Sequence, residues 1–140
     1  MINKDFFDTN VLLYALDIRR GTARDLRADK AEEILCRGGI VSVQVLNEFY
    51  DVASRKFNLN SEKIAELLQV VEAFCGRAIP LTAETHTSAV DITRRHAFRI
   101  YDSLILAAAI QAGCTTVYTE NMQHGQVIEG VRIVNPFLAP

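Results

Sequence analysis

The chain has 140 residues, of which 49% are hydrophobic and 23% charged, and its formal net charge is −2. This length suits one domain with its own hydrophobic core, and no linker-like stretch divides it, so we expect a single domain over residues 1–140. The slight negative charge excludes a strongly basic nucleic-acid binder, and the longest apolar run, residues 104–110, is far shorter than the roughly 20 residues of a membrane span, so we expect a cytoplasmic protein without a membrane partner.

The spacing of apolar residues predicts strands that alternate with single or paired helices. In chain order we expect a first strand that ends at Asp8, a helix at 11–16, a helix from about 23 to 37, a strand at 40–41, a helix capped by Ser42, a helix capped by Asn60 or Ser61, a strand near 78–81, helices at 82–96 and 101–112, and strands at 115–119 and 131–134. The helix after Ser42 and the next one are expected to form a helical hairpin. The whole pattern predicts an α/β fold, a three-layer α/β/α sandwich with a central, mainly parallel sheet.

Acidic residues directly after a strand are the first functional candidates, because ligands of such sheets bind beyond the carboxyl ends of the strands. Asp8 and Glu120 both stand at such positions. A helix N-cap is the alternative explanation for Asp8, since a strand ends and a helix begins there. Asp8 therefore needs acidic partners before it indicates chemistry.

Two further acids stand near the starts of predicted helices. Asp102 opens a helix that is apolar or small almost all round, which predicts a buried helix, and a salt bridge to Arg99 is the alternative to a functional role. Glu48 lies beside the apolar stripe of the helix after Ser42, where the alternative is an ordinary solvated surface residue. Each acid alone is weak evidence.

In combination, Asp8, Glu48 and Asp102 stand near the starts of three helices that leave the same edge of the predicted sheet. Two carboxylates about 4 Å apart repel by roughly 4 kcal/mol at an effective dielectric near 20, so a fold that gathers three of them needs bound cations. Hard oxygen ligands with high negative charge suit Mg²⁺ or Mn²⁺. This constellation predicts metal-assisted hydrolysis of a phosphodiester.

The stretches around these acids resemble the motifs of the PIN-domain family. Residues 6–12, 42–49 and 101–109 are similar to the three acidic motifs of the family in order and spacing, and residues 119–126 and 131–137 resemble its closing motif and last strand. The likeness covers nearly the whole chain. Within the family, the chain is similar to the toxin subunits of bacterial VapBC-type toxin–antitoxin modules.

The resemblance implies an endoribonuclease that cuts an RNA substrate with Mg²⁺ or Mn²⁺, a homodimer, and a small antitoxin whose tail blocks the site. It assigns Asp8, Glu48 and Asp102 as the catalytic, metal-binding acids, and Thr9 or Asn10 as the residue that orients the first acid.

The fourth metal ligand is left open by the sequence. Many members of the family carry an acid shortly after the last long strand, where this chain has Glu120 followed by Asn121. Either the Glu120 carboxylate, the Asn121 carbonyl oxygen or a water would then take this position.

Two other functions are to be weighed. A PIN-like domain that binds RNA or a protein without cutting would fit the missing fourth acid. A domain that accepts a phosphoryl group on Asp8 would carry a second Asp at the position of Asn10 and a late lysine, but no lysine occurs after Lys63.

Basic residues are clustered in two stretches. Arg19, Arg20, Arg24, Arg27 and Lys30 form the first, and Arg94, Arg95 and Arg99 precede Asp102. These residues either contact an RNA backbone or balance nearby acids on the surface.

Overall fold

A four-stranded mixed sheet lies at the centre of the part of the chain that this computed structural model describes, residues 4–18 and 25–138. The strand order is β1-β2-β4-β3. β1 (Asp5–Phe7), β2 (Thr116–Tyr118) and β4 (Val131–Val134) are parallel, and β3 (Val127–Ile128) runs antiparallel to β4. The predicted α/β class with a mainly parallel sheet is confirmed.

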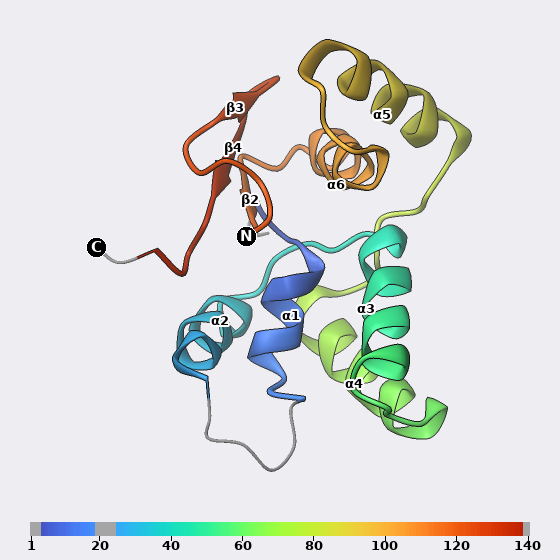
Figure 1. The fold of residues 1–140 in the computed structure, drawn as a ribbon, viewed down its shortest axis with the longest axis vertical. Helices are drawn as coiled ribbons and strands as arrows, with labels where there is room; N and C mark the ends of the chain where they lie inside the picture. The colour runs from blue at the N-terminus through green and yellow to red at the C-terminus, as the bar shows by residue number, and fades with distance from the viewer. Residues whose placement is uncertain (1–3, 19–24, 139–140) are drawn as a thin grey trace.

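Six helices surround the strands in the described residues: α1 (Thr9–Ala15), α2 (Leu26–Cys36), α3 (Val43–Arg55), α4 (Ser61–Cys75), α5 (Ala83–His96) and α6 (Ile100–Gln111). Figure 1 shows α1 to α4 gathered below the strands and α5 with α6 beside them, on the right. α3 packs against α4 as the expected helical hairpin. The arrangement is the predicted sandwich of helices on both sides of a sheet.

The starts of the helices follow their capping residues. The Ser42 hydroxyl accepts a hydrogen bond from the Val45 amide at the start of α3, and the Asn60 side chain accepts one from the Lys63 amide at the start of α4, as the sequence predicts. α2 begins after its N-cap Asp25 and not near residue 23, and residues 19–24 lie outside the described part of the chain.

The strands expected at 40–41 and 78–81 are reduced to single parallel bridges, between Phe6 and Ile40 and between Ser42 and Ile79. Ser42 already caps α3, so an extended segment that begins near residue 40 cannot continue past Ser42. Gly39 allows the close approach that starts the bridge, because a Cβ there would lie 2.5 Å from the Phe7 ring. These bridges nevertheless bring the start of α3 to the sheet edge where β1 ends.

The hairpin of β3 and β4 is an element that the sequence analysis did not predict. Glu129 and Gly130 connect the two strands with φ angles of 47° and 85°, the positive values that a two-residue type I′ turn requires. The Glu-Gly pair between two short apolar runs was the available signal.

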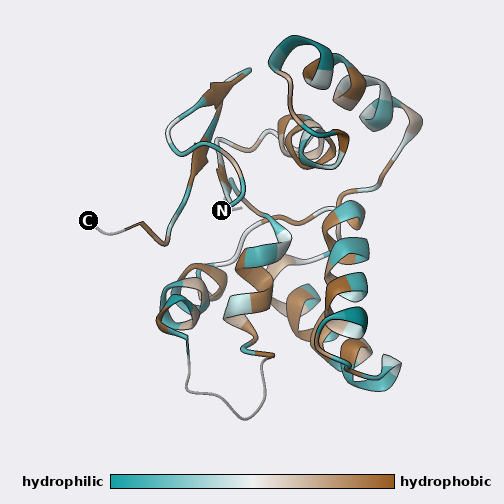
Figure 2. Cartoon of the chain, viewed as in Figure 1, coloured by the Kyte–Doolittle hydropathy of each residue, from teal (hydrophilic) through white to brown (hydrophobic). Residues whose placement is uncertain are grey.

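Burial follows the apolar pattern. Residues 103–109 of α6 are all buried, which confirms the buried helix expected there, and Figure 2 shows α6 mostly in hydrophobic colours while α5 alternates. Phe6 and Phe7, whose side chains point to opposite faces of β1, are both fully buried. None of the helices within the described ranges is long and apolar enough to cross a membrane.

Candidate functional site

Asp8 stands between the end of β1 and the start of α1, and only 3% of its surface is exposed. It is the N-cap of α1: its Oδ1 accepts a hydrogen bond of 2.7 Å from the Thr9 amide, while its Oδ2 accepts one of 2.7 Å from the Thr119 hydroxyl. Burial raises the pKa of Asp8 to about 6, although both hydrogen bonds oppose the rise. Asp8 therefore does cap α1, yet within the described residues no cation is bonded to its buried carboxylate.

Glu48 lies on the face of α3 that is turned toward Asp8, and it is half-buried rather than a solvated surface residue. Its Oε2 accepts a hydrogen bond of 3.1 Å from the Thr9 hydroxyl, and its Oε1 accepts one of 3.4 Å from the Gln44 amide. Burial raises the pKa of Glu48 despite these bonds. Thr9 thus links the first two acids, its amide to Asp8 and its hydroxyl to Glu48.

Asp102 lies in the first turn of α6 and is half-buried. Burial raises its pKa, and the positive charge of Arg99 acts in the opposite direction. The salt bridge weighed from the sequence is not formed, since no ion pair joins these two described residues. Arg99 is therefore near Asp102 without neutralising it directly.

The three acids line one open pocket of about 560 Å³, together with Asn121. They come from the β1–α1 junction, from α3 and from α6, so elements far apart in sequence meet at one sheet edge. Because the three carboxylates line the same pocket, the negative charges of Glu48 and Asp102 both help to raise the pKa of Asp8.

The chemistry of this donor set fits a hard divalent cation, because it consists of carboxylate oxygens and one amide oxygen. None of the three acids makes an ion pair with another described residue, and the charge of Arg99 only partly offsets the charges of Glu48 and Asp102. The acids do not form a closed cage, however: among residues 4–18 and 25–138, no three His, Cys, Asp or Glu side chains stand close enough together to hold one metal ion. An ion would therefore take its remaining ligands from Asn121 and water, or the side chains would rotate toward it.

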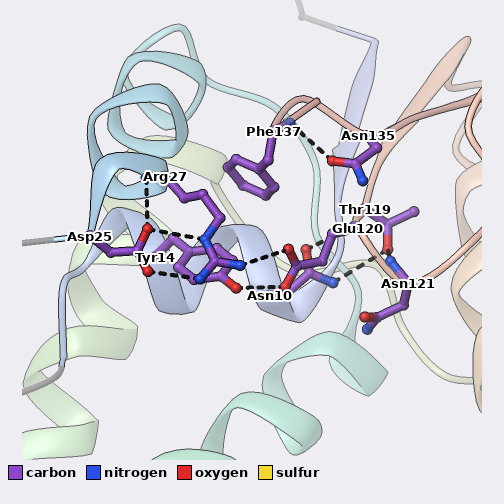
Figure 3. A network of polar contacts seen from close by, with 9 residues as sticks. All are labelled: Asn10, Tyr14, Asp25, Arg27, Thr119, Glu120, Asn121, Asn135 and Phe137. Carbon is purple, nitrogen blue, oxygen red and sulfur yellow. Dashed lines mark hydrogen bonds and ion pairs between the residues drawn. The ribbon is translucent and has the colours of Figure 1, made fainter. Parts of the chain in front are cut away.

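Glu120 lies outside this pocket, although the sequence analysis weighed it as a metal ligand. Its Oε1 accepts a hydrogen bond of 2.6 Å from the Tyr14 hydroxyl, and its Oε2 lies 3.4 Å from the Arg27 guanidinium. Figure 3 shows these contacts as one network, in which Arg27 also pairs with Asp25 at 2.8 Å. The network faces a separate pocket of about 470 Å³ next to the acidic one. In this arrangement the Glu120 carboxylate does not reach the acidic pocket.

Asn121 takes the opposite direction from its neighbour in sequence. Figure 3 shows its side chain apart from the network of Tyr14, Arg27 and Glu120, with no contact drawn between them. Its backbone amide donates to the Thr119 hydroxyl at 3.1 Å, which fixes the backbone at this position, and its exposed side chain lines the acidic pocket. Of the two side chains weighed for the fourth ligand, the structure places Asn121 near the three acids.

Thr119 is a residue of the site that the sequence analysis did not single out. Its fully buried hydroxyl donates to Asp8 and accepts from the Asn10 amide group at 3.3 Å and from the Asn121 amide. Asn10 in turn accepts a hydrogen bond of 3.2 Å from the Glu120 amide. A threonine at the end of a strand is common, so only its position directly before Glu120 could have pointed to this role.

The basic residues divide into paired and unpaired groups. Arg27 is held by Asp25 and Glu120, and Arg95 pairs with Asp91 and Glu129. The interpretation as surface charges that balance acids therefore holds for both arginines. Arg99 lines the acidic pocket instead. Arg19, Arg20 and Arg24 lie outside the described residues.

Comparisons with known proteins give one family and one fold. The family model described as PIN domain matches residues 6–127. The structure of a toxin–antitoxin complex from Klebsiella pneumoniae is similar with a TM-score of 0.68 and 19% identity, over 95% of this chain and 98% of that one. VapBC2 from Rickettsia felis, bound to a DNA fragment from their promoter, is similar with a TM-score of 0.62 and 21% identity, over 95% and 97% of the two chains. VapC20 from Mycobacterium tuberculosis, a toxin that cleaves the sarcin–ricin loop, gives 0.62 and 18%, over 81% and 86%. No curated protein sequence matches the chain.

Proposed function

The chain belongs to the PIN domain family, and on this premise we propose that it is a Mg²⁺- or Mn²⁺-dependent endoribonuclease that hydrolyses RNA phosphodiester bonds as the toxin of a toxin–antitoxin module. The observation that carries the proposal is the pocket lined by Asp8, Glu48 and Asp102. Burial raises the pKa of each acid, and no described residue forms an ion pair with any of them. A fold keeps such uncompensated acids together at a cost in stability, which a bound cation offsets.

The residues of the chain have distinct tasks in this reaction. Asp8, Glu48 and Asp102 would hold the ions, with the amide oxygen of Asn121 as a neutral ligand. When bound, divalent ions between such acids activate a water and stabilise the leaving oxygen of the phosphodiester. Thr9 and Thr119 fix the orientation of the acids through the hydrogen bonds described above. Arg99 brings a positive charge to the pocket mouth, where an RNA phosphate would enter.

The toxin assignment extends to partners. The similar structures from Klebsiella pneumoniae and Rickettsia felis are toxin–antitoxin proteins, which supports a small antitoxin as partner of this chain. A homodimer and an RNA substrate complete the proposal. An antitoxin that occupies the acidic pocket would bring its own positive charge to the three acids.

A metal titration with RNA tests the activity. We expect cleavage of single-stranded or structured RNA that rises with Mn²⁺ or Mg²⁺ and stops in EDTA, and that is lost in Asp8→Asn. Asp91→Asn is the matched control, because Asp91 is exposed on α5 and pairs with Arg95 away from the site. RNA that stays intact at every metal concentration would contradict the nuclease function. The toxin function is tested separately: expression in bacteria should arrest growth, and the Asp8→Asn variant should not.

One observation favours a second function, a PIN-like domain that binds RNA or a protein with weak or no cleavage. The described acids do not form a preformed three-carboxylate metal site, and an amide stands where a fourth acid would be. Binding of RNA without metal-dependent turnover would establish this alternative in place of the nuclease.

A further inference from the structure

Tyr101 is an aromatic residue at the mouth of the acidic pocket. It lies in the first turn of α6, directly before Asp102, and 51% of its surface is exposed. Tyrosines usually bury much of their rings. The aromatic pairs within the described residues all involve other rings, so the ring of Tyr101 is not stacked on another aromatic side chain there. An aromatic surface is thus left open beside the acids.

Arg99 lies two residues before Tyr101 and lines the same pocket. Its charge lowers the pKa of both Glu48 and Asp102, yet it forms no ion pair with a described residue. The other arginine of the pocket, Arg55, is paired with Asp51 at 3.1 Å. Arg99 therefore has a guanidinium group that is available to an incoming anion.

We infer that Tyr101 stacks on an unpaired nucleobase beside the phosphate at the acids, while Arg99 contacts the RNA backbone. An aromatic plane and a guanidinium group next to metal-binding acids match the parts of a nucleotide, its base face and its phosphate. A base inside a duplex has both faces covered by its neighbours, so the inference narrows the substrate to single-stranded or looped RNA. It rests on the proposed function, which supplies the phosphate at the acids.

A fluorescence titration tests the stacking without any cleavage. The chain has no tryptophan, so Tyr101→Trp introduces a single reporter at the pocket. We expect its emission to be quenched by a single-stranded oligoribonucleotide, in EDTA or with Ca²⁺ present, and not by the same strand annealed to its complement. Tyr50→Trp is the matched control, because Tyr50 is 43% exposed on α3 and does not line the pocket. Its emission should stay unchanged with both RNAs.

Binding constants supply the second measurement. Tyr101→Ala should weaken binding of the single strand roughly 5- to 160-fold, the range for loss of one stacked base, and Tyr101→Phe should bind as tightly as the wild type. Tyr50→Ala should leave binding as in the wild type. Arg99→Ala should reduce the slope of log affinity against log salt concentration by roughly 0.7, as expected for one lost phosphate contact to a single strand.

Three results would overturn the inference: no quenching in EDTA and with Ca²⁺, equal quenching by duplex RNA, or unchanged affinity in Tyr101→Ala. The nuclease proposal fails through a different result, the absence of metal-dependent cleavage by the wild-type protein. A protein that cleaves RNA while Tyr101→Ala binds normally would refute the stacking alone. If Tyr101 stacks on RNA but the wild-type protein never cleaves it, only the nuclease proposal is refuted.

Discussion

Two carboxylate sites lie next to each other in this protein and differ in how their charge is compensated. Asn10 and Leu13 line both pockets, so the two sites share a wall. Glu120 is held by the Tyr14 hydroxyl and the Arg27 guanidinium, whereas Asp8 is bonded to neutral groups and faces two other acids. The carboxylate of the first site has a cationic partner, whereas no described residue forms an ion pair with the three acids of the second, although Arg99 lines the same pocket. The presence or absence of a cationic partner, and not the number of acids, therefore distinguishes a structural carboxylate from a candidate ligand-binding one.

The largest effect expected from this difference concerns Asp102→Asn. Loss of one ligand charge should lower the rate of metal-dependent RNA cleavage on the order of 100-fold or more. Thermal stability in EDTA should stay the same or rise, because a repelling carboxylate is removed. Cleavage rates at saturating Mn²⁺ and melting curves in EDTA check both. A variant that cleaves normally would remove Asp102 from the site, and one that unfolds would make it a structural residue.

The second prediction concerns pH, since burial raises the pKa of Asp8 to about 6 from the ordinary 3.8 of an aspartate. A carboxyl whose pKa is raised by folding costs no stability below its unfolded pKa, and the cost grows as pH rises and is complete above its folded pKa. A shift of about two units corresponds to about 3 kcal/mol. Asp8→Asn should therefore stabilise the metal-free protein by up to about 3 kcal/mol above pH 6 and by little near pH 4.

Urea denaturation in EDTA at several pH values measures this difference. The gain from Asp8→Asn should follow the titration of one group between about pH 4 and pH 6. Asp91→Asn, a change of the same chemistry at an exposed ion pair, should show no such profile. A gain for Asp8→Asn that is independent of pH would mean that the Asp8 carboxyl is not penalised by burial.

A smaller effect is expected at the compensated site. Tyr14→Phe removes the hydroxyl that donates to Glu120 at 2.6 Å and should lower the free energy of unfolding by about 1–2 kcal/mol. The metal concentration for half-maximal cleavage should not change. Tyr50→Phe is the control, since Tyr50 is exposed on α3. A large shift in the metal midpoint of Tyr14→Phe would mean that the two sites act as one.

The features that could be predicted from the sequence are those set by neighbouring residues, such as helix caps and the ends of strands. The caps Ser42 and Asn60 place α3 and α4 correctly, because a cap acts within a few residues. Asp8 was found by its position where a strand meets a helix, and Asp102 by its position at the start of an apolar helix. These positions follow from the order of elements in a parallel sheet, so the pocket could be predicted without any contact being known.

The direction of Glu120 could not be predicted from the sequence. Its partners Tyr14 and Arg27 lie 106 and 93 residues away, and neither has a spacing or motif that links it to Glu120. Thr119 was missed for a similar reason, because its contact with Asp8 spans 111 residues. Pairings over such distances depend on how β1 and β2 align side by side, with Phe7 opposite Tyr118, and this register is fixed only in the folded sheet.

The smallest expected effect distinguishes Glu120 from its neighbour Asn121. The Asn121 side chain lines the acidic pocket, and its amide oxygen is a neutral ligand that attracts a divalent ion less than a carboxylate does. Asn121→Asp should therefore lower the metal concentration for half-maximal cleavage several-fold, by on the order of 1 kcal/mol of added attraction at the half-solvated pocket mouth. Glu120→Gln should leave this midpoint unchanged, because the Glu120 carboxylate is bonded to Tyr14 and Arg27 and faces the other pocket. Metal titrations of the wild type and both variants decide the point. If Glu120→Gln raises the midpoint and Asn121→Asp does not lower it, Glu120 breaks its contact with Arg27 when the ion binds. Its carboxylate then moves into the acidic pocket as the fourth ligand.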